Sequence, residues 1–63
     1  MDYITITPAD ACLIIETRKP LGKFFVDVED EFTHVYVGID NSTGDAWTEE
    51  FTDKDECLDW LSQ

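Results

Sequence analysis

The shortness of the chain limits it to one small hydrophobic core. A domain of 63 residues buries only about 60% of the surface that its unfolded chain exposes, so its stability is small or is helped by a partner. Apolar residues make up 43% of the chain and aromatic residues 13%, which is too many for a disordered acidic tail. We therefore expect a single compact domain over residues 1–63.

The second constraint is a formal net charge of −11, from 15 acidic residues against 4 Lys and Arg. This charge is unevenly distributed along the chain. Residues 1–26 hold three acids and three bases, whereas residues 27–63 hold twelve acids and one base, Lys54. The charge argues against direct binding of nucleic acid, which requires a Lys/Arg patch, and against docking on anionic membranes.

The N-terminal sequence has neither a basic segment nor the long apolar stretch of a secretory signal. The longest apolar run, residues 11–15, is far shorter than the ~20 residues that span a bilayer. We therefore expect a cytoplasmic protein. Cys12 and Cys57 either form a disulfide between the two ends of the chain or remain two buried thiols, and the reducing cytosol favours the thiols.

The first part of the chain predicts a strand followed by a helix. Residues 3–7 alternate and are rich in β-branched side chains, as in a short strand or an extended arm. Thr7 is a suitable N-cap, and the proline after it suits the first helical position. The pattern predicts a helix over residues 8–19, ended by Pro20. The β-branched pair at residues 14–15 favours a strand instead, but the capping pattern outweighs it.

Three alternating runs follow, at residues 23–28, 33–40 and 46–51. An acidic link joins the first two runs, and the turn sequence Asn41-Ser42-Thr43-Gly44 joins the second and third. Such short connections predict a three-stranded antiparallel meander. Alternation places Phe25 and Tyr36 on one face of this sheet, opposite the more apolar face.

The chain ends with the pattern of an amphipathic helix. Thr52 or Asp53 begins a capping box, and Cys57, Leu58, Trp60 and Leu61 follow at helical spacing. The expected fold class is therefore α+β with the order β-α-β-β-β-α: an N-terminal strand or arm, a helix, the meander and a C-terminal helix. We expect both helices to lie on one face of the sheet, leaving the face with Phe25 and Tyr36 open.

Candidate groups for catalysis or metal binding are few. His34 is the single histidine, and because alternation places it on an exposed strand face, a cysteine–histidine nucleophile is the weaker interpretation. A calcium loop beginning at Asp40 would need Gly at position 45 and Glu at position 51, where Asp45 and Phe51 stand. A domain this small also has little volume for a cleft that shifts a carboxylate pKa. We therefore expect no catalysis, no cofactor and no metal site.

The remaining signal is the acidic surface itself. Ordinary surfaces mix both signs of charge, and the self-repulsion of a strongly charged small domain lowers its stability, which favours a function over solubility alone. Carboxylates on a folded surface can occupy the Lys/Arg sites that normally hold phosphates. We expect partner binding by Asp27, Glu29, Asp30, Glu31, Asp40, Asp45, Glu49, Glu50, Asp53, Asp55, Glu56, Asp59 and Tyr36.

The acidic clusters between Asp27 and Asp59, together with the small size and the sheet-plus-helix pattern, resemble a class of small inhibitors. These are the DNA mimics of bacteriophages and mobile elements, including anti-CRISPR proteins, anti-restriction proteins and uracil-DNA glycosylase inhibitors. No motif of one family is matched, so no site residue is carried over. In such proteins acids imitate phosphates and an apolar loop fills a pocket; here Phe25, Tyr36 and the connection over residues 29–32 are candidates for that apolar part.

The resemblance implies a non-enzymatic inhibitor that blocks DNA binding by a host defence or repair protein, such as a CRISPR effector nuclease. Its partner would be a basic nucleic-acid-binding protein, met in the host cytoplasm if the chain is phage-encoded. The alternative is a small soluble interaction module whose acids serve solubility only. Such a module would form a homodimer through the open sheet face with Phe25 and Tyr36.

Overall fold

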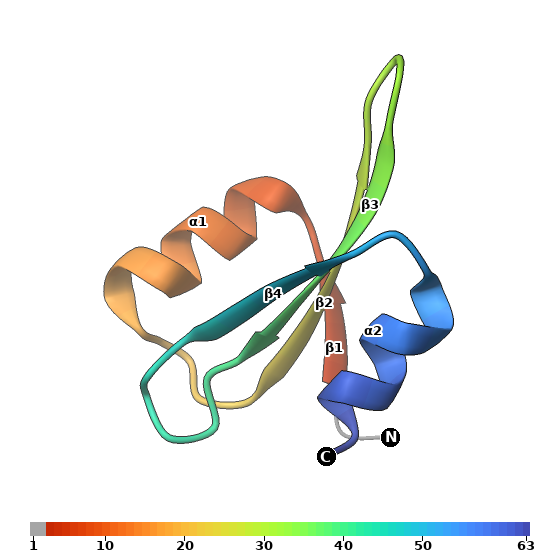
Figure 1. The fold of residues 1–63 in the computed structure, drawn as a ribbon. Coiled ribbons are helices and arrows are strands. Elements are labelled where there is room, and N and C mark those ends of the chain that lie inside the picture. Colours follow the sequence, from red (N-terminus) through yellow and green to blue (C-terminus); the bar gives the residue numbers. More distant parts are fainter. Residues whose placement is uncertain (1–2) are drawn as a thin grey trace.

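The computed structural model describes residues 3–63 and has the α+β fold that the sequence predicts (Figure 1). The elements are β1 (Tyr3–Ile6), α1 (Pro8–Thr17), β2 (Lys23–Glu29), β3 (His34–Asp40), β4 (Trp47–Phe51) and α2 (Lys54–Leu61). This confirms the predicted order β-α-β-β-β-α. Within the described range, neither helix is long and apolar enough to cross a membrane.

The sheet has four strands in the order β1-β2-β3-β4. The meander pairs antiparallel as expected, with Val26 opposite Val37 and Gly38 opposite Glu49. The N-terminal segment is a strand rather than a loose arm, and it pairs parallel to β2, with Thr5 beside Phe25. The sheet is therefore mixed and four-stranded, because α1 supplies the crossover that a parallel pair of strands needs.

Helix α1 begins at the predicted residue and ends two residues before the predicted end. The Thr7 hydroxyl accepts a hydrogen bond from the Asp10 backbone N–H at 3.1 Å, as an N-cap does. The helix ends at Thr17 instead of residue 19, because Arg18 takes the left-handed conformation with φ 62°. The Arg18 backbone N–H then donates to the Ile14 carbonyl, which closes the last turn.

One core layer lies between α1 and the sheet. Ala11 and Ile14 of the helix are buried together with Phe24, Val26 and Ile39 of the strands. The three strand residues share one face because side chains alternate along a strand. The alternation that the sequence predicts for β2 and β3 is therefore confirmed.

Helix α2 covers the opposite face of the sheet, so the prediction that both helices share one face is wrong (Figure 1). Cys57 and Leu61 of α2 are buried against Phe25, and Trp60 packs directly on Gly38. A Cβ atom at Gly38 would lie only 2.8 Å from the Trp60 ring. The missing side chain at position 38 therefore lets the helix approach the aromatic second face of the sheet.

The sheet face expected to be open is therefore covered. Phe25 is only 4% exposed, and Tyr36 is half-buried, with its ring 5.9 Å from the Phe25 ring. Packing of aromatic rings in this layer stabilises α2 on the sheet. The dimerisation face of the alternative interpretation does not exist in this fold.

Asn41 joins two loops that are distant in sequence. Its buried amide donates to the Pro20 carbonyl at 2.9 Å and accepts from the Ala46 backbone N–H at 3.1 Å. Its backbone also exchanges two hydrogen bonds with Gly22. The positive φ angles of this turn fall on Gly44 and Ala46.

The two cysteines are free thiols on opposite sides of the sheet. Cys57 belongs to α2 and is buried against the sheet, and this burial raises the pKa of its thiol. Cys12 lies exposed on α1, so the expectation of two thiols is confirmed and the expectation that both are buried is wrong.

Candidate protein-binding surface

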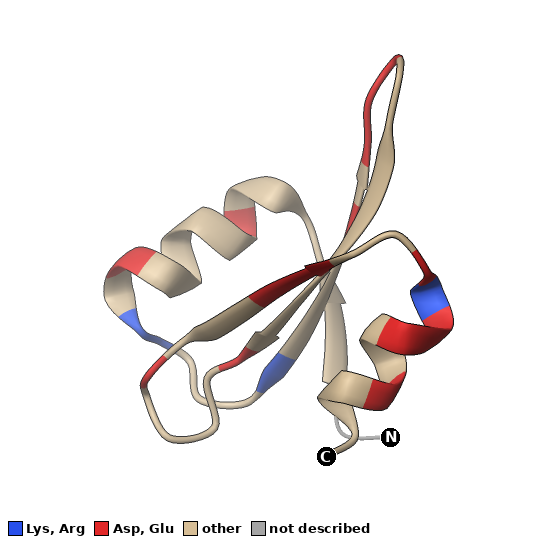
Figure 2. Cartoon of the chain, in the orientation of Figure 1, with Lys and Arg blue, Asp and Glu red and all other residues tan. Residues whose placement is uncertain are grey.

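Most of the acidic residues gather on the side of the sheet that α2 covers. Asp27 follows Phe25 at an alternate position of β2, and Glu49 of β4 lies opposite Gly38, so both share the face on which α2 packs. Figure 2 shows the acidic positions on α2 and on the neighbouring strands. We call this surface the acidic face; it consists of Asp27, Glu29, Asp40, Glu49, Asp53, Asp55, Glu56 and Asp59.

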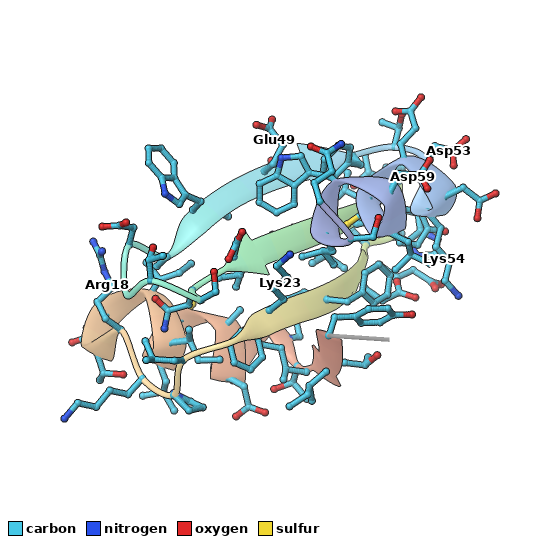
Figure 3. All side chains as sticks on the ribbon, turned by 90° about the horizontal axis from the view of Figure 1, so that it is seen from below. Arg18, Lys23, Glu49, Asp53, Lys54 and Asp59 are labelled. Carbon is cyan, nitrogen blue, oxygen red and sulfur yellow. The ribbon has the colours of Figure 1, made fainter. Side chains whose placement is uncertain are left out.

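The labelled side chains of Figure 3 show how helix and strand contribute to one surface. Glu49 of β4 projects on the same side as Asp53 and Asp59 of α2. Lys54 extends from the other side of the helix, and its ammonium lies 5.9 Å from the centre of the Phe25 ring. The cation of α2 is therefore directed away from the carboxylates that face outward beside β4.

Tyr36 shares the α2 side of the sheet, whereas the four remaining predicted acids lie elsewhere. Glu50 alternates with Glu49 and therefore lies on the α1 side of the sheet. Asp45 lies in the β3–β4 turn, where the Thr43 hydroxyl donates to it at 2.8 Å. Asp30 and Glu31 lie in the turn between β2 and β3. The twelve acids therefore do not form a single surface, although eight of them share the acidic face.

Three carboxylates of the acidic face have partners within the fold. The Asp27 carboxylate contacts the His34 ring nitrogen Nε2. The Asp53 carboxylate accepts from the backbone N–H of Asp55 at 2.8 Å and so caps α2. This confirms Asp53, and not Thr52, as the N-cap of this helix.

The third partnered carboxylate belongs to Asp40. It accepts hydrogen bonds from the Ser42 hydroxyl at 2.7 Å and the Ser42 backbone N–H at 3.1 Å. These bonds, and to a lesser extent the charge of Lys23, lower the Asp40 pKa below its ordinary 3.8, while slight burial opposes them. Because the pKa in the folded state is the lower one, this carboxylate stabilises the fold at neutral pH, and the contribution is lost as the pH falls through the lowered pKa.

We expect Ser42→Ala to raise the Asp40 pKa toward 3.8, because the hydroxyl bond is the largest cause of the shift. An NMR titration of the carboxyl carbons measures this change. Thr43→Ala is the matched control, since the Thr43 hydroxyl bonds Asp45 instead. An Asp40 pKa that rises equally in both variants would contradict the assignment.

The other carboxylates of the acidic face point to solvent without a side-chain partner. Within residues 3–63, no intrachain hydrogen bond or ion pair is formed by the side chains of Glu29, Glu49, Asp55, Glu56 and Asp59. The cations serve other contacts: Arg18 donates to the Gly44 and Asp45 carbonyls at 3.2 and 2.8 Å, and Lys23 donates to the Gln63 carbonyl. The five carboxylates without a side-chain partner are therefore available to cations outside the chain.

The β2–β3 hairpin extends beyond the body of the domain (Figure 1), and its turn holds an exposed aromatic residue. Strand pairing runs out to Glu29 opposite His34, and the Asp30 backbone N–H closes the turn on the Thr33 carbonyl at 2.8 Å. Phe32 in this turn is 89% exposed. The connection over residues 29–32 therefore presents one apolar side chain among acids.

Trp47 is an exposed aromatic residue that the sequence reasoning did not assign to the site. Trp47 and Phe51 alternate with Thr48 and Glu50 and share the α2 side of the sheet. Phe51 packs against Trp60 with ring centres 6.0 Å apart, whereas Trp47 is 65% exposed. Its exposure and its position on the same face as Glu49 make it a candidate contact residue.

In the part of the chain that the structure describes, no group of three His, Cys, Asp or Glu side chains is arranged to hold a metal ion. Comparison with protein-family models, with curated proteins and with solved structures finds no match.

Proposed function

We propose that this protein is a non-enzymatic inhibitor that binds the basic nucleic-acid-binding surface of a host defence or repair protein, such as a CRISPR effector nuclease. It would exclude DNA by presenting carboxylates in place of phosphates. The observation that supports the proposal is the acidic face, on which five carboxylates have no partner within residues 3–63.

The acidic face is suited to arginine and lysine as ligands. A carboxylate accepts charge-assisted hydrogen bonds from these side chains as a phosphate does, and arginine can bind it through two parallel bonds. Glu49 lies on a strand, and Asp55 and Asp59 lie on a helix packed against the sheet. Their backbone positions are therefore fixed before binding, which lowers the entropy lost in the complex.

The exposed aromatic residues complement the charges. Charged groups at the rim of an interface mainly speed association, whereas buried aromatic side chains often supply much of the affinity. Phe32 at the hairpin turn and Trp47 beside Glu49 are both largely exposed. In the proposed complex they fill apolar pockets next to the cationic groove of the partner.

The proposal is tested by adding the purified protein to three enzymes that act on DNA. These are a CRISPR effector nuclease with its guide RNA, a type I restriction enzyme and a uracil-DNA glycosylase. We expect inhibition of at least one when the protein is added before DNA, less inhibition when DNA is bound first, and weaker binding at higher salt. Absence of inhibition in all three would contradict the proposal.

The role of the acidic face is tested with two variants that lose the same charge. D55N/E56Q/D59N removes three carboxylates from the acidic face, and E16Q/D45N/E50Q removes three from outside it. We expect the first to bind the inhibited enzyme about tenfold to a hundredfold more weakly, mainly through the association rate. The second should bind nearly as the wild type does, and equal losses would mean that net charge alone matters.

A further inference from the structure

The outer edge of β1 combines an unpaired strand with an apolar groove. Within the described sheet β1 pairs only with β2, so its other edge is free. Beside it lies a groove of about 360 Å³. The groove is lined by Ile4 and Ile6 of β1, Leu13 and Ile14 of α1, Phe24 and Pro20, with Asp10 and Lys19 as its charged residues.

Apart from its shortness, this edge has no charged residue or proline that would oppose strand pairing. Natural edge strands are commonly guarded by charged residues, proline or a bulge, whereas residues 3–6 are Tyr-Ile-Thr-Ile. Two groove residues are widely exposed, Ile4 at 62% and Leu13 at 59%. An extended strand is the occupant that would satisfy both the free backbone groups and the apolar side chains.

The charges at this edge favour a second copy of the same chain. Residues 1–26 carry no net charge, since three acids balance three bases. The two charged groove residues have opposite signs and lie at opposite ends of α1: Asp10 in its first turn and Lys19 just after its end. A surface with this arrangement is complementary to itself after a two-fold rotation.

We propose that two copies of this protein pair through antiparallel β1 strands about a two-fold axis at Thr5. In this register Ile4 of each copy lies opposite Ile6 of the other. Residues opposite each other in an antiparallel pair share a face of the sheet. The two α1 helices therefore lie on the same face of the joined sheet, next to the paired β1 strands. The Leu13 side chains then fill the shared groove, and Asp10 of each copy meets Lys19 of the other.

The dimer leaves the acidic face free. β1 and β4 lie at opposite edges of the sheet, so the strands that carry Glu49 become the outer strands of an eight-stranded sheet. Helix α2 packs on the face opposite α1, away from the two groove helices. The dimer therefore presents two acidic faces without burying either.

The proposal is tested by the molar mass in solution, from sedimentation equilibrium over a range of concentrations. We expect the wild type to reach twice the monomer mass, and Ile4→Lys to remain monomeric and folded by circular dichroism. Leu21→Lys is the matched control, because Leu21 is equally exposed at 65% but lies outside the groove, and it should dimerise as the wild type does. A wild type that stays monomeric at about 1 mM, or loss of the dimer in both variants, would overturn the proposal.

The register is tested by oxidation of Thr5→Cys in a Cys12→Ser background. Two cysteines opposite each other at the axis should form an interchain disulfide, whereas Thr48→Cys on the other edge strand should not. A dimer that cross-links through position 48 and not through position 5 would overturn the assignment.

The salt dependence distinguishes this proposal from the proposed function. Raising NaCl from about 50 to about 500 mM screens the repulsion between two negatively charged copies, so the dimer should be maintained or strengthened. The same screening should weaken binding of the acidic protein to a basic enzyme.

Discussion

Replacing Asn41 by alanine is expected to destabilise the domain by about 3 kcal/mol, because two part-buried backbone groups lose the partner that a fully buried side chain gives them. The Asn41 side chain is fully buried, and it bonds the Pro20 carbonyl and the Ala46 backbone N–H. Alanine can replace neither bond and also leaves a cavity. For a domain of this size, whose stability is expected to be only a few kcal/mol, such a loss leaves a large unfolded population.

Urea unfolding followed by far-UV circular dichroism measures the effect of Asn41→Ala. The control is Thr43→Ala in the same turn, whose exposed hydroxyl bonds only the Asp45 carboxylate; its free energy of unfolding should change by less than about 0.5 kcal/mol. If both variants were equally stable, Asn41 would not be the residue that joins the two loops.

Gly38→Ala is expected to destabilise the domain by about 2 kcal/mol, through overpacking between β3 and α2. The added methyl group would lie 2.8 and 2.9 Å from two ring carbons of Trp60 and 3.3 Å from the Leu61 side chain. The indole is held between the strand and Phe51, so it cannot move aside without loosening the helix. Replacing glycine by alanine stabilises a protein by about 0.4–1 kcal/mol at positions where alanine fits without strain. The destabilisation expected from overpacking at position 38 is larger than this gain.

A double-mutant cycle with Trp60→Leu separates overpacking from other effects of Gly38→Ala. Leucine at position 60 removes the ring atoms nearest to Gly38, so adding the methyl group should then have little effect on the free energy of unfolding. If Gly38→Ala were equally harmful in both backgrounds, the contact with Trp60 would not be the cause.

The local pattern of the sequence predicts most of the secondary structure, for reasons that lie within a few residues. The Thr7 cap and the Asp53 cap act on backbone groups two or three residues away. The alternation in β2 and β3 assigns each side chain to a face without information about the rest of the chain. The end of α1 was misplaced because Arg18 takes a left-handed conformation while its side chain bonds the distant β3–β4 turn.

The faces that the helices cover were not predictable in the same way. Alternation shows that Phe25 and Tyr36 share a face, but it does not show whether that face meets water, a partner or α2. The absence of a side chain at Gly38 becomes meaningful only when Trp60, which is distant in sequence, packs on it. The same holds for Trp47 and Phe51, which share a face although one is exposed and the other half-buried.

The sequence by itself determined that the negative charge lies after residue 26 and that the domain is a small α+β fold. The charge follows from composition, and the elements follow from helix caps and from the period of the apolar residues. None of these depends on which strands pair in the sheet. Only the tertiary structure decided that eight acids share one face, that α2 covers the second side of the sheet and that β1 keeps a free edge. These features depend on strand order and on contacts between distant residues, which no local pattern in the chain specifies.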